Sequence, residues 1–167
     1  LLILDEAYVE LAPEGTAYMG DIEDPRIIRM RTFSKGYGMA GARVGYAMGA
    51  TEVIRSFEKI RNHFGMNRAA QIGALEALRD TQWLKETLNK VADARARIGT
   101  IARENGLRTL PSATNFVAID CGHDGDFARK VLAALVAQGI FVRMPFVAPQ
   151  DRCIRVSCGP DALLDLL

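Results

Sequence analysis

One stretch, RTFSKGYGMAGARVGYAMG at residues 31–49, constrains the fold of this chain more than any other. Three of its glycines spell G-x-G-x-x-G, a dinucleotide fingerprint that requires a helix directly after the last glycine. The residues after Gly41 instead have the period of a strand, with apolar side chains at every second position: Ala42, Val44, Tyr46 and Met48. A strand cannot present a helix N-terminus to a phosphate, so the glycines must serve another purpose.

The residues around this stretch predict an α/β arrangement. LLILDEAY at the start is a short apolar run that predicts a strand buried on both faces of a parallel sheet and ending at Asp5. We expect two more strands, which lead into and out of the glycine loop, at residues 26–35 and 42–49. Helical periodicity then predicts three helices, the second with Asn67 as its N-cap and the third long and amphipathic, at residues 50–64, 67–80 and 82–104.

Beyond Gly106, whose residue type favours the end of a helix, the pattern predicts a smaller α+β unit. Its expected elements are a strand, a helix and two strands, at residues 107–122, 126–139, 140–144 and 153–159. The predicted domains are therefore residues 1–80, a connecting helix at 81–105, and residues 106–167. Both chain ends interrupt an expected element, so we expect this sequence to be part of a longer protein.

Composition excludes several functional classes. The formal net charge of +1 indicates neither a nucleic-acid-binding nor a membrane-surface patch. No apolar run approaches the ~20 residues of a membrane span. The cysteines, of which no two form C-x-x-C, predict buried thiols of a reducing cytoplasm and no metal site: Cys121, Cys153 and Cys158.

Two segments supply candidates for chemistry at one edge of the expected sheet. Asp5 follows a parallel strand, at the edge where open α/β sheets bind ligands, and Tyr8 can reach the same place. Lys35 stands at the end of another strand beside glycines, where a lysine can form a Schiff base. Arg43 offers a guanidinium for phosphate, and Thr32 and Ser34 offer hydroxyls. Each residue alone is more often an ordinary surface residue, but together they indicate an aldehyde cofactor that carries a phosphate.

DEAY at residues 5–8 and RTFSKGYGMAGARVGY at residues 31–46 resemble the aspartate and lysine motifs of fold-type I pyridoxal-phosphate aminotransferases, most closely the histidinol-phosphate aminotransferase group. The likeness covers almost the whole chain, because RNHFGMNRAAQIGALEAL, PSATNF, GIFVRM and CIRVSCG follow in the family's order. The lysine motif is its specific part. The resemblance implies an α/β fold made of the C-terminal part of the large mixed or parallel-sheet domain and a small α+β domain.

The resemblance also implies roles for individual residues. Lys35 would be the catalytic lysine bound to pyridoxal 5'-phosphate, Asp5 would pair with the ring nitrogen, and Tyr8 would donate to the 3-oxygen of the ring. The phosphate would be held by Thr32, Ser34 and Arg43. Substrate would be bound by Asn115, Arg143 and Arg155, with Arg155 on the α-carboxylate.

The function implied is transfer of an amino group between an amino acid and a 2-oxo acid, by a cytoplasmic homodimer. The amino donor could be histidinol phosphate or an aromatic amino acid, because Arg143 can be either a phosphate ligand or a surface arginine. Two alternatives remain open at this point. One is a decarboxylase similar to threonine-phosphate decarboxylase, and the other is a non-enzymatic nucleotide-binding module.

Overall fold

The computed structural model describes all of residues 1–167, which form two compact units, Leu1–Leu88 and Asn89–Leu167. The division falls within the long helix α3, Thr81–Glu104. Each unit has its own three-stranded sheet. None of the helices is both long and apolar enough to cross a bilayer.

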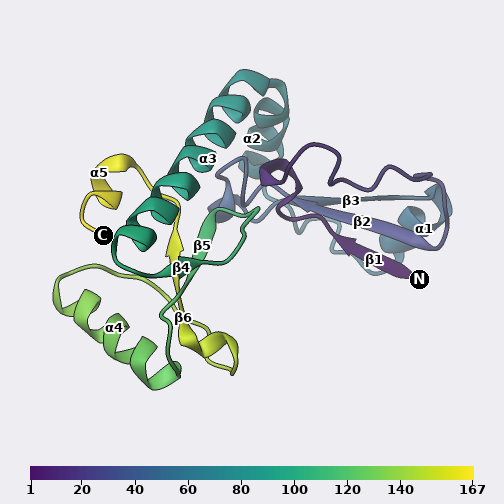
Figure 1. Cartoon of the computed structure of the whole chain (residues 1–167). Coiled ribbons are helices and arrows are strands. Elements are labelled where there is room, and N and C mark those ends of the chain that lie inside the picture. The colour runs from purple at the N-terminus through teal and green to yellow at the C-terminus, as the bar shows by residue number, and fades with distance from the viewer. The chain divides into compact units, whose positions relative to one another are not determined.

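The sheet of the first unit has the order β1-β2-β3, with β1 at Leu2–Asp5, β2 at Ile27–Thr32 and β3 at Gly45–Gly49 (Figure 1). β1 is parallel to β2, and β2 is antiparallel to β3. Asp5 pairs with Met30, and Thr32 pairs with Gly45. The ends of β1 and β2 and the start of β3 therefore lie together along one edge of the sheet, the edge at which β1 and β2 terminate.

The prediction that β1 is buried on both faces is wrong for this chain. β1 is an edge strand, and its Leu2 and Ile3 side chains are 52% and 62% exposed. A short apolar run bounded by acidic and turn residues predicts a strand by its length and pattern. The same run does not reveal which neighbours cover it, so the strand itself was predictable and its burial was not.

Helices and loops build the rest of the first unit. α2 occupies Arg68–Arg79, and Asn67 caps it as predicted, with its Oδ1 accepting a hydrogen bond from the Ala70 amide at 2.8 Å. α1 covers only Thr51–Ser56 and continues as a 3-10 turn, so the helix expected over residues 50–64 is shorter than predicted. A small apolar core joins α2 to the glycine loop through Phe33, Val44, Ala70 and Ala74.

The sheet of the second unit is antiparallel, with β4 at Arg108–Thr109, β5 at Phe116–Asp120 and β6 at Cys153–Ser157. α4 spans Gly125–Ala137 and α5 spans Asp161–Leu164. Gly106 has a φ of +71°, which fits its predicted place after α3. The main core includes residues of α3, β5, β6 and α4, among them Ala94, Ile98, Val117, Ala128 and Ile154.

Alternation along β5 and β6 gives this sheet two different faces. Val117 and Ile119 pair with Val156 and Ile154, and all four side chains belong to the core. Arg155 lies between the two core residues of β6 and therefore points to the opposite face. The strand expected at residues 140–144 does not form, because only Arg143 pairs there, in an isolated bridge with Arg155.

Candidate functional site

The edge of the first sheet brings together segments from three elements. Asp5 ends β1, and Thr32 ends β2 three residues before Lys35. Arg43 stands two residues before the start of β3. The predicted cofactor residues are thus collected at the carboxyl ends of two parallel strands, where open α/β sheets bind ligands.

Lys35 lies beside Tyr8 at this edge. The Lys35 Nζ atom is 5.0 Å from the centroid of the Tyr8 ring, within the range of a cation–π contact. Lys35 itself is half-buried. Asp5 is exposed, and its Oδ1 accepts a hydrogen bond from the Ala7 amide at 3.0 Å, which fixes the turn that leads to Tyr8. The two motifs predicted to share a site are therefore in contact through Tyr8 and Lys35.

The backbone of the lysine loop is tied down by its own hydrogen bonds. The Thr32 hydroxyl accepts from the Ser34 amide at 3.0 Å and lies 3.5 Å from the Val44 carbonyl oxygen. The Gly38 amide donates to the Lys35 carbonyl at 3.0 Å. Thr32 therefore stabilises the turn that presents Lys35, in addition to any contact it makes with a ligand.

Arg43 was predicted on the strand that returns from the loop, and this placement is wrong. It follows a 3-10 turn at Ala40–Ala42 and adopts the left-handed conformation, with φ at 54° and ψ at 48°. Its Nη1 donates to the Ala40 carbonyl at 2.9 Å, and its side chain is exposed. The chain must reverse between β2 and β3, and Arg43 contributes to that reversal before β3 begins at Gly45.

The three glycines that match the dinucleotide fingerprint differ in their surroundings and backbone conformation. A Cβ atom on Gly36 would lie 3.2 Å from the Glu10 Cβ, so the loop packs closely there. Gly38 has a φ of +68°, a conformation that side chains rarely adopt. A Cβ atom on Gly41 would have no neighbour within 4 Å. A 3-10 turn and a strand follow, with no α-helix, so the geometry of a dinucleotide fingerprint is absent from this loop.

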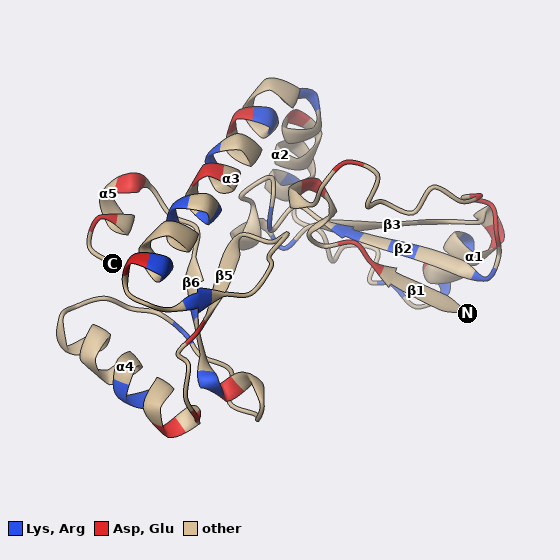
Figure 2. Cartoon of the chain, in the orientation of Figure 1, with Lys and Arg blue, Asp and Glu red and all other residues tan.

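Glu6, the residue after Asp5, was not among the site residues expected from the sequence. It is 8% exposed, and its carboxylate accepts hydrogen bonds from Arg29 Nε and Nη2 at 3.0 and 2.9 Å and from Arg31 Nε at 2.9 Å. Figure 2 shows positive residues along β2. Burial would raise the pKa of Glu6, but the bonds from Arg29 and Arg31 outweigh it and lower the pKa. The only signal for this contact in the sequence was the presence of two arginines at alternate positions of the strand expected at residues 26–35.

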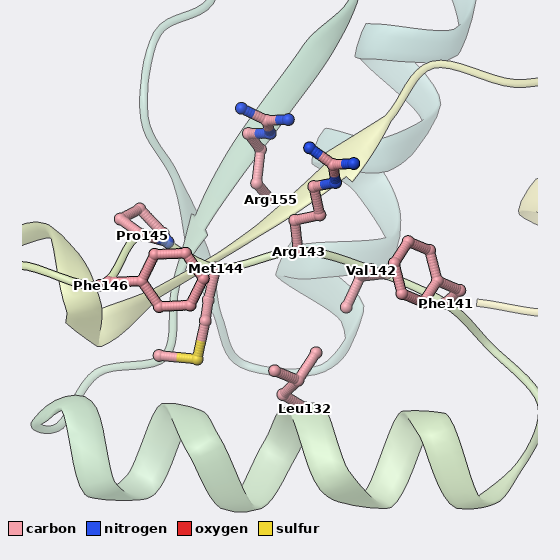
Figure 3. A pocket seen from close by; sticks show the side chains of 8 residues that line it. All are labelled: Leu132, Phe141, Val142, Arg143, Met144, Pro145, Phe146 and Arg155. Carbon is pink, nitrogen blue, oxygen red and sulfur yellow. The ribbon is translucent and has the colours of Figure 1, made fainter.

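The second unit holds a pair of arginines on the sheet face opposite its core. Arg143 and Arg155 exchange backbone hydrogen bonds of 3.1 and 2.6 Å, so they stand directly opposite each other. Figure 3 shows both guanidinium groups pointing in the same direction, away from α4. Like charges placed opposite each other are unfavourable unless an anion lies between them.

Arg155 is the more strongly held of the two. Its guanidinium carbon lies 4.6 Å from the centroid of the Phe116 ring, and its Nε atom is buried with no hydrogen-bond partner. A buried donor without a partner is costly, and a ligand can supply the acceptor. Asn115 directly precedes β5, and its carbonyl accepts from the Cys158 amide at 2.9 Å.

A pocket of about 530 Å³ includes both arginines in its wall. The rest of the wall is largely apolar and comes from α4 and the loop before β6: Leu132, Phe141, Val142, Met144, Pro145 and Phe146 (Figure 3). Such a lining suits a molecule with an anionic group and an apolar or aromatic body.

The family profile described as "Aminotransferase class I and II" matches residues 1–167, and the chain belongs to this family. The fold and family predicted from the two motifs are therefore confirmed.

Individual proteins that resemble the chain have names more specific than that of the family. A histidinol-phosphate aminotransferase of Jannaschia sp. (strain CCS1) is 38% identical over 161 residues, covering 95% of this chain and 44% of that protein. One from Brachyspira hyodysenteriae is 32% identical, covering 99% and 47%. The crystal structure of histidinol-phosphate aminotransferase from Sinorhizobium meliloti in complex with pyridoxal-5'-phosphate is 53% identical, with a TM-score of 0.95, and covers 99% and 46%. The chain thus spans about half the length of the relatives it matches.

Proposed function

We propose that this chain is part of a pyridoxal-phosphate aminotransferase of the histidinol-phosphate type, which works as a cytoplasmic homodimer. The observation that carries the proposal is the placement of Lys35 against Tyr8, at the sheet edge where Asp5 ends β1. The family to which the chain belongs and the names of its relatives support the same activity. Those relatives favour transamination over the decarboxylase alternative.

The residues at this edge fit pyridoxal phosphate by their chemistry. The group has an aldehyde, a basic ring nitrogen, a phenolic oxygen and a phosphate. This chain offers an amine on Lys35, a carboxylate on Asp5 and a phenol on Tyr8, and the cation Arg43 with the hydroxyls of Thr32 and Ser34 could bind the phosphate. The close approach of Gly36 to Glu10 leaves little room for a larger side chain beside Lys35.

The proposed roles follow from charge and reach. When bound, pyridoxal phosphate supplies an electron sink for charge that develops at the substrate Cα. The Asp5 carboxylate keeps a proton on the ring nitrogen, because a nearby negative charge favours the protonated form. Tyr8 donates to the ring oxygen. Lys35 would hold the cofactor, and its amine, when not bound to it, would move a proton at the substrate Cα.

The second unit is proposed to bind the substrate anions. Arg155 takes the α-carboxylate, which supplies the acceptor that its buried Nε lacks. Arg143, directly opposite, takes the phosphate of a histidinol-phosphate-like substrate. Asn115, next to the strand β5 that pairs with β6, contributes a polar contact to the substrate. Fixing the substrate in this way orients the bond that breaks.

The test is an assay of the complete enzyme with 2-oxoglutarate and several amino donors. We expect glutamate to form rapidly with histidinol phosphate and more slowly with phenylalanine. Release of carbon dioxide from O-phosphothreonine without formation of glutamate would support the decarboxylase instead. Glutamate formation at the same rate from every amino acid would overturn the assignment of a phosphate-bearing substrate.

A further inference from the structure

The buried carboxylate of Glu6 joins three segments of the first unit. Its backbone amide donates to the Met30 carbonyl at 2.9 Å, which completes the pairing of Asp5 with Met30 at the end of β1. Its side chain accepts from Arg29 and Arg31 of β2. It also accepts from the Tyr18 amide at 3.2 Å, in the segment between the two strands. Four donors therefore converge on one buried carboxylate.

These contacts lie on the opposite side of the sheet from Asp5. Side chains alternate along a strand, so Asp5 and Glu6 face opposite ways, while Arg29 and Arg31 share the face of Glu6. None of the Glu6 contacts would use the groups that bind cofactor. They fix the backbone from which Asp5 projects, and they do so from behind.

Residues on the Glu6 side of the sheet also connect to the loop that carries Lys35. Arg31 pairs with Tyr46 of β3 and is followed by Thr32, the last residue of β2. Glu10 packs against Gly36, the residue after Lys35. Movement of Arg31 relative to Glu6 would therefore shift the end of β2 relative to the end of β1.

We infer that Glu6 is a positioning residue, which sets the distance between Asp5 and the loop of Lys35 by clamping β1 to β2 through Arg29 and Arg31. This inference rests on the proposed function, since it assigns Asp5 and Lys35 to one cofactor. Reaction rates respond steeply to such spacing, and a displacement of about 1 Å can cost about 100-fold. Glu6 acts through its neighbours and does not touch the reacting atoms.

The second unit offers a matched control. Asp120 is 6% exposed and likewise accepts hydrogen bonds from two arginines, Arg152 Nε at 2.8 Å and Arg108 Nη2 at 3.1 Å. It lies outside the proposed cofactor residues. Glu6→Gln and Asp120→Asn each remove one buried charge from a pair of arginines while keeping the shape of the side chain. A general loss of stability should affect both variants in the same way.

The experiment measures three properties of the full-length protein: hydrogen exchange of the Glu6 amide without cofactor, the dissociation constant for pyridoxal phosphate, and the pH midpoint of the visible absorbance of the bound cofactor. For Glu6→Gln we expect faster exchange at Glu6, a dissociation constant raised about 10-fold or more, and a shifted midpoint. Asp120→Asn should leave all three unchanged. Arg31→Lys, which keeps the charge but removes the Nε donor that bonds Glu6, should give smaller changes in the same direction.

Wild-type values in both Glu6→Gln and Arg31→Lys, or equal changes in Asp120→Asn, would overturn this positioning role. If Glu6→Gln does not fold, Arg31→Lys decides alone. Absence of visible cofactor absorbance from the wild-type protein would have a different meaning. It would overturn the proposed function, and the positioning role with it.

Discussion

The left-handed backbone at Gly38 allows a quantitative test of the lysine loop. Gly38 has a φ of +68°, and a Cβ atom there would meet only the Trp83 ring, at an ordinary 3.5 Å. Gly38→Ala should therefore act through backbone strain, without a steric clash. A residue with a Cβ in this conformation costs about 1–2 kcal/mol.

Gly41→Ala is the matched control from the same loop. Gly41 has no neighbour within 4 Å of its Cβ position and no left-handed φ, so alanine should be tolerated. It should stabilise by about 0.4–1 kcal/mol, because it restricts the unfolded chain. This restriction of the unfolded chain applies to Gly38→Ala as well and cancels in the comparison, so the two variants should differ by the strain alone, about 1–2 kcal/mol in the free energy of unfolding.

Urea unfolding followed by tryptophan fluorescence measures this difference. Trp83 belongs to the same unit as Gly38 and Gly41, and its ring lies next to the Cβ position of Gly38. Equal stabilities of Gly38→Ala and Gly41→Ala would refute the account of Gly38. A Gly41→Ala variant that is the less stable of the two would refute the account of both glycines.

Three further predictions concern charged groups. Asp5→Asn should leave pyridoxal phosphate bound but lower kcat severely, since an amide does not stabilise the ring proton; near-normal kcat would remove Asp5 from the mechanism. Arg143→Ala should raise KM for a phosphate-bearing donor far more than KM for phenylalanine, and equal effects would show that Arg143 does not bind phosphate. Hydrogen bonds from the Gly122 amide, Arg152 and Arg108 lower the pKa of Asp120 to about 2. The stability that Asp120 contributes is therefore present above about pH 4 and lost as the pH falls toward 2, so the acid unfolding of Asp120→Asn should lack this component.

Local patterns made most of the elements predictable. Asn67 capped α2 as expected, and the alternation after Gly41 correctly favoured a strand over the helix of a dinucleotide fold. These features depend on residues close in sequence. The predicted strand at residues 140–144 reduced to one bridge, because strand pairing depends on a partner that the local pattern does not contain.

The candidate site was predictable only in part, for a similar reason. Lys35 and Asp5 carry residue types that indicate their chemistry directly. The role of Glu6 depends on Arg29 and Arg31, more than twenty positions away, and only the folded sheet brings them together. Likewise, the buried Nε of Arg155 is a consequence of the surrounding packing, which the sequence did not reveal.

The central claim is that Lys35 binds the cofactor covalently, and borohydride reduction of the complete enzyme tests it most directly. Reduction converts a Schiff base to a stable secondary amine, which peptide mass spectrometry can locate. We predict one pyridoxyl-phosphate group, attached to Lys35 in the peptide TFSKGYGMAGAR. The other lysines are exposed, and we expect them to stay unmodified: Lys59, Lys85, Lys90 and Lys130. An adduct on one of these lysines, or none on Lys35 in fully reconstituted enzyme, would contradict the account.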